Sequence, residues 1–534
     1  MGEEAKHPIL VGGRWRPARR PHRWFRAVDP STGAETEGLY PVSDASDLED
    51  ALAEGRAAAR DMAAAGADAI ADFLEAYARG IAGRAGEIVA AAHRETGLPE
   101  APRLRDVELP RTIDQLRQAG REARDRSWRR ATIDTRAGLR SIREPLGGPV
   151  AVFGPNNFPL AYNAVAGTDF ASAIAAGNPV IAKAHPCHPA VTRMLGETAF
   201  ACLEKSDLPR AAVQLLYHLR PEDGLALVAD RRIGASAFTG SRPGGLKLKE
   251  AADRAGRPIY LEMSSVNPVF LLPGALRERG ETIAAELFGS CTGGAGQFCT
   301  KPGLVVLIDD EGGRRFFDAL AAAFAGSPPQ ILLGESVRDG IRAALRAMTG
   351  AGAVVVAGGC APTGPGFRFE NTLLRATGDA FLASPSALQQ EAFGPVSLAL
   401  FVRDGAEMAA VADALEGNLA AAVFSHSGGE DDALYARVAP LLRTRCGRLL
   451  NDKVPTGVLV SPAMVHGGPY PATAHPGFTA VGFPAAMIRF TALRCYDRVR
   501  PRRLPPELRD ENPTGTMWRW IDGDLTQGNA APGS

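Results

Sequence analysis

Residues 289–301 read G-S-C-T-G-G-A-G-Q-F-C-T-K, and the second cysteine of this run is Cys299. Small residues on both sides let other backbone segments come close, so the thiol of Cys299 could meet a substrate there. A cysteine taken alone is more often a small buried hydrophobic residue. For Cys299 the reactive thiol is favoured over the buried hydrophobic residue, because four residues upstream stand at or just after the ends of short apolar runs. They are Asn157, Lys183, Gly240 and Glu262.

Apolar runs and helix-like segments alternate from residue 148 onward. Strands are expected at residues 150–153, 180–183, 213–217, 234–238 and 259–262. Short buried runs that alternate with helices are typical of a parallel, doubly wound sheet. Ligands bind at the carboxyl ends of such strands, so the four upstream residues are predicted to share one edge of the sheet.

A second α/β unit is expected from about residue 268, with strands at 305–308, 354–356, 397–401 and 421–424. Residues 289–301 lie at its start, so a cleft between the two units is the natural ligand site. Residues 131–144 alternate in polarity and predict a hairpin that projects from the body and serves subunit contact. Near the N-terminus, S-D-L-E at residues 46–49 is a capping box that predicts the start of an alanine-rich helix.

Length and charge narrow the class of protein. The chain has 534 residues, too many for one ordinary core, which predicts two or three domains. A hydrophobic fraction of 45% and a charged fraction of 22% are typical of globular proteins. Lys and Arg number 60, as do Asp and Glu. This balance argues against nucleic acid or an anionic membrane as the main partner.

The cysteine pattern favours a reducing compartment. Seven cysteines are scattered without C-x-x-C spacing, which fits the cytoplasm and not a disulfide framework. The N-terminus shows no apolar leader and the chain no apolar run of roughly 18 residues, so we expect a cytoplasmic protein with no membrane partner. The segment His185-Pro-Cys187-His188 has the look of a metal cluster, but its interleaved prolines and the lack of a second ligand pair argue against a metal.

The upstream motifs each allow two readings. Residues 240–245, G-S-R-P-G-G, follow a strand and open a helix, so they are either a pyrophosphate cradle or a plain helix entry. They match neither G-x-G-x-x-G nor the phosphate-binding P-loop, because Leu246 stands where the P-loop needs lysine. Lys183 at a strand end is unfavourable to bury alone, and a ligand phosphate or ribose is a suitable partner. Glu262 is either a salt-bridged structural residue or a general base whose pKa is raised by apolar neighbours.

Five motifs occur in one order along the chain. They are P-N-N-F-P from Pro155, F-T-G-S from Phe238, L-E-M-S-S-V-N-P from Leu261, G-Q-F-C-T from Gly296 and E-A-F-G-P-V from Glu391. In this order and spacing the chain resembles the aldehyde dehydrogenase superfamily, from about Pro8 to Tyr496. The stretches K-A-H-P-C-H-P from Lys183 and M-V-H-G-G-P-Y-P-A-T from Met464 resemble its NADP-linked branch. That branch contains 2-oxoglutarate semialdehyde dehydrogenases and a bacterial fatty aldehyde dehydrogenase.

The resemblance implies an α/β fold with two doubly wound domains and a small β element for oligomerisation. The cofactor-binding domain would comprise residues 1–130 and 145–266, and the catalytic domain residues 267–460. The oligomerisation element would comprise residues 131–144 and 461–498. Residues 499–534 would be a C-terminal extension, expected to be surface-bound or partly frayed. A homodimer or homotetramer is expected.

The resemblance also implies the NAD(P)-dependent oxidation of an aldehyde to a carboxylic acid. Cys299 would attack the aldehyde as a thiolate, while the Asn157 amide and the Cys299 backbone N–H would hold the oxyanion. Hydride would leave to the nicotinamide, and Glu262 would activate the water that releases the acid. The implied cofactor contacts are Lys183, Gly240, Ser241, Gly245, Glu391 and Phe393. The implied substrate lining is Phe158, Tyr162, Val165, Gln297 and His466.

The position three residues after Lys183 bears on the choice of cofactor. NAD-preferring relatives tend to carry a glutamate there, which bonds the adenosine ribose, whereas this chain has Pro186. Without a carboxylate to repel a 2′-phosphate, Lys183 can attract one, with His185 or Arg220 in support. NADP is therefore the expected cofactor, with NAD possible.

The sequence leaves the aldehyde open. A dicarboxylic semialdehyde such as 2-oxoglutarate semialdehyde needs a cation for its distal carboxylate. Arg242 and Arg489 are candidates, but nothing in the sequence places either beside Cys299. An aromatic, mostly apolar lining suits an aliphatic or aryl aldehyde equally well. A CoA-acylating relative and a catalytically silent protein on the same fold are the alternatives. The presence of Glu262 counts against the first, and the intact set with Asn157 and Cys299 counts against the second.

Overall fold

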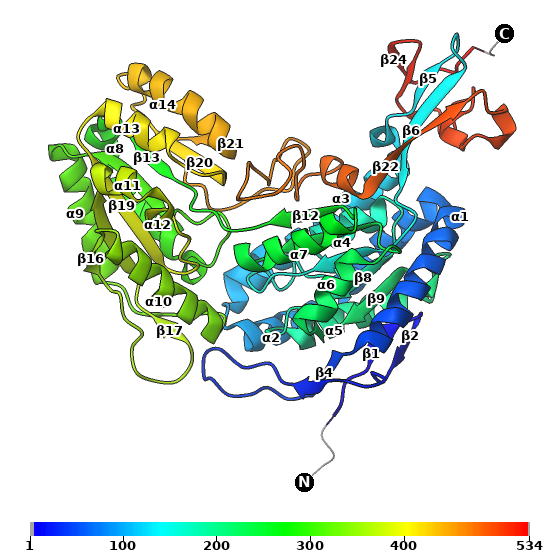
Figure 1. Cartoon of the computed structure of the whole chain (residues 1–534), viewed down its shortest axis with the longest axis horizontal. Coiled ribbons are helices and arrows are strands. Elements are labelled where there is room, and N and C mark those ends of the chain that lie inside the picture. Colours follow the sequence, from blue (N-terminus) through cyan, green and yellow to red (C-terminus); the bar gives the residue numbers. More distant parts are fainter. Residues whose placement is uncertain (1–4, 532–534) are drawn as a thin grey trace.

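The structure is a computed structural model and describes residues 5–531. Figure 1 shows two α/β lobes side by side, with a β-stranded arm that projects from the N-terminal lobe. Each lobe is built on its own seven-stranded sheet. The expected α/β fold with two sheet-based units is therefore confirmed.

The sheet of the first lobe has the strand order β12-β11-β7-β8-β9-β1-β2. Its parallel strands are β7 (Val150–Phe153), β8 (Val180–Lys183), β9 (Val213–Leu216), β11 (Ala235–Thr239) and β12 (Ile259–Glu262). They are connected by α4 (Thr168–Ala175), α5 (Pro189–Leu203), α6 (Pro221–Ala229) and α7 (Arg242–Arg254). The antiparallel strands β1 (Ile9–Val11) and β2 (Arg14–Arg16) extend the sheet. The parallel strands are mostly buried, as continuous apolar runs predict.

Helices from the N-terminal part of the chain pack on this sheet. They are α1 (Ala45–Gly83), α2 (Ala85–Thr96), the π-helical segment Glu100–Glu108 and α3 (Leu109–Asp125). The N-cap of α1 is Asp44, whose side chain accepts from the N–H groups of Ser46 and Asp47. The capping-box prediction at residues 46–49 was wrong by two residues, because aspartate is as good a cap as serine. A small sheet of β3 (Arg23–Phe25), β4 (Tyr40–Ser43) and β10 (His218–Leu219) lies alongside.

The sheet of the second lobe has the order β16-β18-β19-β14-β13-β20-β21. Its strands are β13 (Val269–Leu271), β14 (Leu304–Ile308), β16 (Val354–Ala357), β18 (Thr372–Thr377), β19 (Val396–Val402), β20 (Asn418–Phe424) and β21 (Cys446–Asn451). All neighbours are parallel except β16 and β18. The helices are α8 (Pro273–Thr292), α9 (Glu311–Ala325), α10 (Glu335–Gly350), α11 (Gly378–Ala383), α12 (Pro385–Leu388), α13 (Gly405–Asp413) and α14 (Asp432–Arg445). A short pair, β15 (Gln330–Ile331) and β17 (Arg368–Phe369), completes the lobe.

The arm is a five-stranded sheet of order β22-β6-β5-β23-β24. Strands β5 (Thr132–Asp134) and β6 (Leu139–Pro145) form the predicted hairpin, and β22 (Thr491–Asp497) pairs with β6. The C-terminal segment adds β23 (Arg519–Ile521), which pairs with β5, and β24 (Asp524–Thr526). Of the two expected states, surface-bound or partly frayed, the described part of the extension is not frayed but folded into the arm, because its apolar residues bury a small core with those of β5 and β6.

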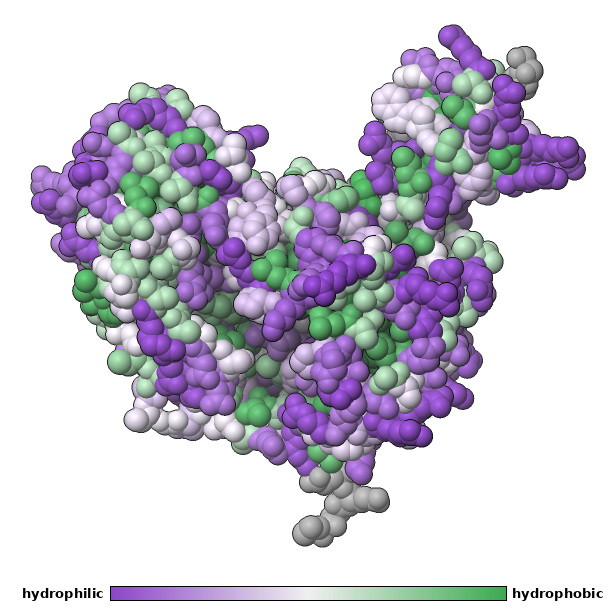
Figure 2. All heavy atoms as spheres, viewed as in Figure 1, coloured by the Kyte–Doolittle hydropathy of each residue, from purple (hydrophilic) through white to green (hydrophobic). Residues whose placement is uncertain are grey.

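Among residues 5–531 no helix is both long and apolar enough to cross a bilayer. Figure 2 shows polar and apolar residues interspersed over the drawn face, with a hollow between the lobes.

Candidate active site

A cleft with a volume of about 880 Å³ lies between the two lobes. Lys183 and Glu262, the last residues of β8 and β12, line its first wall together with Asn157 from the loop after β7. The strand register pairs Phe153 with Lys183 and Thr239 with Glu262, so these carboxyl ends meet at one edge of the sheet. The structure therefore brings the residues at the predicted strand ends into one site.

The second lobe contributes Cys299, from a loop that follows α8. The loop turns through Gly294 and Gly296, whose φ angles of 58° and 64° lie in the left-handed region. A Cβ atom on Gly296 would lie 2.3 Å from the carbonyl oxygen of Gly394. The side-chain amide of Asn267 donates to the Cys299 carbonyl at 2.9 Å. These contacts fix the thiol against the strand ends of the first lobe.

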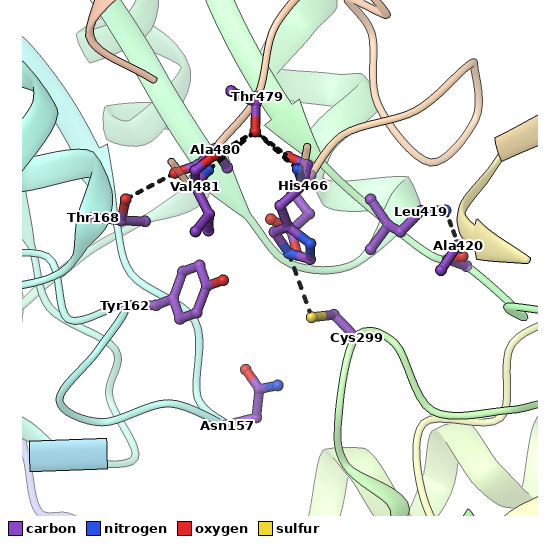
Figure 3. Close-up of polar contacts among 12 residues, drawn as sticks. Asn157, Tyr162, Thr168, Cys299, Leu419, Ala420, His466, Thr479, Ala480 and Val481 are labelled. Atoms are coloured by element: carbon purple, nitrogen blue, oxygen red, sulfur yellow. Dashed lines mark hydrogen bonds and ion pairs between the residues drawn. The ribbon is translucent and has the colours of Figure 1, made fainter. Parts of the chain in front are cut away.

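His466 joins Cys299 to Glu262. Its Nε2 lies 3.6 Å from the Cys299 Sγ and 2.9 Å from the Glu262 Oε1, and Figure 3 shows the imidazole directed at the sulfur. Glu262 is 6% and His466 is 3% exposed. The second carboxylate oxygen of Glu262 has no hydrogen-bond partner among residues 5–531. One imidazole nitrogen thus serves both the predicted nucleophile and the predicted base.

The ionisation of the two acids is displaced in opposite directions. Burial raises the pKa of the Cys299 thiol well above its usual value, and the charge of Glu262 adds to this while Arg111 opposes it. Burial also acts to raise the pKa of Glu262, but the His466 charge and hydrogen bonds from His466 and Cys299 outweigh it and lower the pKa. The prediction of a raised pKa for Glu262 was therefore wrong, because its immediate neighbours are polar. A carboxylate beside a protonated thiol can accept the thiol proton.

Two N–H donors are available close to the Cys299 thiol. The Asn157 amide donates to the Gln297 carbonyl oxygen at 2.9 Å, which fixes its orientation, and Figure 3 shows it directed at the space next to the sulfur. The backbone N–H of Cys299 donates to no acceptor in the described part of the chain. An oxyanion needs such a pair of donors.

The cleft beyond Cys299 has the donors and acceptors that a dinucleotide requires. Burial lowers the pKa of Lys183 to about 8, and its ammonium forms no ion pair with the described carboxylates. Gly240 and Ser241 line the cleft at the N-terminus of α7, where backbone N–H groups suit a pyrophosphate. Glu391 and Phe393 line it from the second lobe. Burial raises the pKa of Glu391 to about 7.

Four residues singled out from the sequence lie elsewhere. Gly245 does not line the cleft but lies beneath it, where a Cβ atom would be 2.9 Å from the Met263 sulfur. Val165 is fully buried in the core of the first lobe. The Gln297 side chain bonds to the backbone of Gly294 and Leu333. Arg220 is held by Asp223 outside the cleft. Small or apolar residues next to a motif are ambiguous, since the sequence does not show which way they face.

An aromatic cluster lies beside Cys299 and outside the cofactor cleft. The ring centroids of Phe158 and Tyr162 are 5.1 Å apart, and Tyr162 lies 6.1 Å from the His466 ring. Phe158 also packs on Phe298, the residue before Cys299. These contacts make the cluster the natural wall for the organic part of an aldehyde.

Three arginines at this cluster were missed by sequence reasoning. Arg103 lies over the rings of Phe158 and Phe298, and Arg111 lies over Phe158 and Tyr162. Arg448 contacts Met464, which packs in the same cluster. The candidates named from sequence are engaged elsewhere. Those are Arg242, which pairs with Glu416, and Arg489, which pairs with Asp169. The missed residues come from a charged helix and an edge strand that carry no recognisable motif.

Comparison with known proteins places this site in a family. The family model described as "Aldehyde dehydrogenase family" matches residues 15–448 of the chain. This chain belongs to the aldehyde dehydrogenase family. It is accordingly an NAD(P)-dependent oxidoreductase that oxidises aldehydes.

Curated relatives and solved structures agree with this assignment. The alpha-ketoglutaric semialdehyde dehydrogenase 2 of Azospirillum brasilense is 40% identical over 507 residues, covering 92% of this chain and 94% of the relative. The alpha-ketoglutaric semialdehyde dehydrogenase of Acinetobacter baylyi is 37% identical, covering 86% and 87%. A crystal structure of aldehyde dehydrogenase C from Pseudomonas syringae with NAD+ and octanal superposes with a TM-score of 0.79. That match, at 20% identity over 93% of this chain and 98% of the other, shows the fold alone.

Proposed function

We propose that this aldehyde dehydrogenase oxidises 2-oxoglutarate semialdehyde to 2-oxoglutarate and prefers NADP as the hydride acceptor. The observation that carries the proposal is that Cys299, His466 and Glu262 converge where the two lobes meet. The Cys299 sulfur, a ring nitrogen of His466 and a carboxylate oxygen of Glu262 all lie within 4.8 Å of one another. The names of the two relatives above support the choice of substrate.

In the first half of the reaction the proton moves against the displaced pKa values, so bond formation between sulfur and carbon has to draw off the thiolate. Glu262 takes the thiol proton of Cys299, and the thiolate sulfur forms a bond to the aldehyde carbon. The electron pair of the carbonyl moves to its oxygen, where the Asn157 amide and the Cys299 N–H donate to it. Loss of one such donor typically costs about 3 kcal/mol of transition-state stabilisation. The product of this step is a thiohemiacetal on Cys299.

When bound, NADP supplies a nicotinamide that accepts hydride from this carbon, which leaves a thioester on the sulfur. Glu262, once it has returned its proton to solvent, has a free carboxylate oxygen to accept a proton from water. His466 holds the other oxygen and so orients the base. The hydroxide adds to the thioester carbon, the thiolate of Cys299 leaves, and the carboxylic acid is released.

The preference for NADP rests on Lys183 and on the missing glutamate at Pro186. The Lys183 ammonium reaches the cleft with no carboxylate partner in residues 5–531, and a 2′-phosphate supplies one. His185 lines the cleft next to it, where burial keeps its pKa well below the usual value and the ring neutral. We expect kcat/KM to favour NADP over NAD, and Lys183→Met to reduce that preference at least about tenfold. Equal or better use of NAD by the unmodified protein would overturn this assignment.

A homo-oligomer in the cytoplasm is the setting that fits best. The arm exposes large apolar residues, which is typical of a subunit contact. They are Leu139, Leu493, Trp518, Trp520 and Leu525. All seven cysteines are free thiols, which suits a reducing compartment. Light scattering on the purified chain measures the number of subunits, and a monomer would contradict the proposal of a homo-oligomer.

The nucleophile assignment has a direct test. Cys299→Ala should abolish turnover of 2-oxoglutarate semialdehyde while leaving NADP affinity unchanged, as measured by calorimetry. Residual turnover above a few per cent of the parent rate would contradict it. Product analysis in the presence of CoA separates the hydrolytic reaction from its CoA-acylating alternative. Free acid is expected, because Glu262 is positioned to activate water.

A further inference from the structure

The three arginines at the aromatic cluster differ in how their charge is neutralised. Arg103 pairs with the buried carboxylate of Glu108 at 2.5 Å and donates to the Asn157 carbonyl oxygen. Arg111 and Arg448 form no ion pair with any carboxylate among residues 5–531. Two of the three guanidinium charges are therefore left without a protein counter-charge.

Arg111 lies on α3, where its guanidinium is stacked on Phe158 and Tyr162. One terminal nitrogen donates to the Tyr162 hydroxyl at 3.0 Å, and the Nε atom is buried without an acceptor in the described residues. Its charge reaches the reacting sulfur, since it acts to lower the pKa of Cys299. Arg111 is thus a half-buried cation with unused donors beside the predicted substrate wall.

Arg448 approaches the same space from the second lobe. It lies on β21 and donates only to neutral groups, the carbonyl oxygens of Pro455 and Gly457. One of its nitrogens lies 3.9 Å from the sulfur of Met464, which packs in the same apolar cluster as Phe158 and Tyr162. Burial lowers the pKa of Arg448, while the nearby Cys299 and Tyr162 act in the opposite direction. Each lobe therefore places an arginine at one apolar cluster.

A buried guanidinium without a counter-charge is costly unless an anion completes it. Its planar donor fork matches a carboxylate better than an ammonium group does. We infer that Arg111, with Arg448 at the same cluster, forms the subsite for a carboxylate at the end of the substrate remote from the aldehyde. This inference deepens the proposed function and rests on it for the identity of the aldehyde. It selects semialdehydes of dicarboxylic acids over simple aliphatic aldehydes.

Three aldehydes with the same five-carbon chain test the subsite. They are 2,5-dioxopentanoate, which has the keto acid, 5-oxopentanoate, which has the carboxylate alone, and pentanal, which has neither. Arg111→Met keeps the bulk of the side chain and removes the charge. We expect it to lower kcat/KM for both carboxylates by about 10- to 100-fold more than kcat/KM for pentanal, because the effect of the Arg111 charge on Cys299 is common to all three aldehydes. The loss should lie in KM, because the contact exists in both ground and transition states.

Arg117→Met is the matched control. Arg117 lies on the same helix and pairs with Glu75 at the surface, away from the cluster. Arg117→Met should leave the ratio of kcat/KM for 2,5-dioxopentanoate to kcat/KM for pentanal unchanged. Arg111→Lys should restore part of the ratio, since it returns the charge without the fork. An equal loss for all three aldehydes in Arg111→Met would overturn the inference, because a general packing defect does not distinguish them.

Binding without turnover separates this inference from the proposed function. Calorimetry on the Cys299→Ala protein, which lacks the thiol nucleophile, compares 2,5-dioxopentanoate with pentanal, so that only the first ligand carries a carboxylate. We expect 2,5-dioxopentanoate to bind at least about tenfold more tightly, and Arg111→Met to remove this difference. If binding behaves so while no aldehyde is oxidised by the unmodified protein, the subsite stands and the proposed reaction falls. If the two aldehydes bind equally, the subsite is wrong whatever the turnover.

Discussion

The thiol of Cys299 and the carboxylate of Glu262 show how a residue's role is set by its surroundings. Burial works against ionisation of both, yet His466 and Cys299 stabilise the Glu262 carboxylate, whereas the charge of Glu262 further opposes ionisation of the thiol. The proton of the resting site therefore stays on sulfur, beside a base that is able to take it. Changes at this scale should alter individual steps of the reaction and leave the fold intact.

Glu262→Gln removes the base that activates water but keeps the size of the side chain. We expect one rapid turnover of NADPH per site and then a steady rate lower by at least about 100-fold, because the thioester accumulates. Stopped-flow absorbance of NADPH measures both phases. An unaltered steady rate would remove Glu262 from the hydrolytic step.

Glu391 gives a prediction about pH. Its carboxyl has a pKa raised to about 7 by burial, so the charged form, which accepts ribose hydroxyls best, is lost as the pH falls below about 7. At pH 6 only about a tenth remains ionised, so between pH 8 and pH 6 the Kd for NADP should rise several-fold relative to that of Glu391→Gln, in which Lys183, with a pKa of about 8, gains charge in the same way. Fluorescence titration over this range measures both proteins. The same pH dependence in Glu391→Gln and in the unmodified protein would contradict the role.

At the scale of elements, the site depends on strand ends and on one turn. Parallel strands deliver Lys183 and Glu262 to one edge without any specific contact between them. The position of Cys299 depends in addition on a close backbone contact, because its loop turns against the backbone of Gly394. Only a glycine fits at position 296 under these conditions.

Gly296→Ala should therefore displace the nucleophile loop. The added Cβ would lie 2.3 Å from the Gly394 oxygen and 2.7 Å from the Cys291 oxygen, in a left-handed conformation. We expect a loss of roughly 2–5 kcal/mol in the free energy of unfolding and a strong drop in kcat. Thermal melts and steady-state kinetics measure these. Gly289→Ala, where a Cβ meets nothing within 4 Å, is the matched control.

At the scale of the whole molecule, the two lobes supply complementary halves of one site, and the arm is built separately. The C-terminal strands β23 and β24 close the arm sheet next to β5. Arg519 is completely buried there and donates to the carbonyl oxygens of Arg509, Asp510 and Gly528. A buried arginine that gathers backbone carbonyls acts as the local core of the extension.

Arg519→Met should loosen the extension without changing the chemistry. Each carbonyl left without a donor costs about 1–3 kcal/mol if it stays buried, so local opening is expected. Hydrogen exchange should rise over residues 505–531 while kcat per site stays within about twofold. The exposed Arg502 provides a control, Arg502→Met, which should leave exchange unchanged. Unaltered exchange in Arg519→Met would show that the extension is held by other contacts.

Several features followed from local sequence. The strands at residues 150–153, 180–183 and 259–262 were predicted with their observed bounds, because short buried apolar runs between helices have few other structures open to them. Other features could not be read locally. Strands β13, β18 and β21 were missed, since short apolar runs are ambiguous between strand and helix. The N-cap of α1 was predicted at Ser46, two residues after the observed cap Asp44, because the sequence does not distinguish between these two good capping residues.

The sequence alone determined the family, the order of motifs and the place of Lys183 and Glu262 at the cleft, because these two residues end parallel strands whose shared edge is set by topology. Only the tertiary structure decided that His466 links Cys299 to Glu262 and that Arg111 and Arg448 face the aromatic wall. Those residues come from segments far apart in the chain. Their direction depends on packing between the lobes, and no local pattern of residues records it.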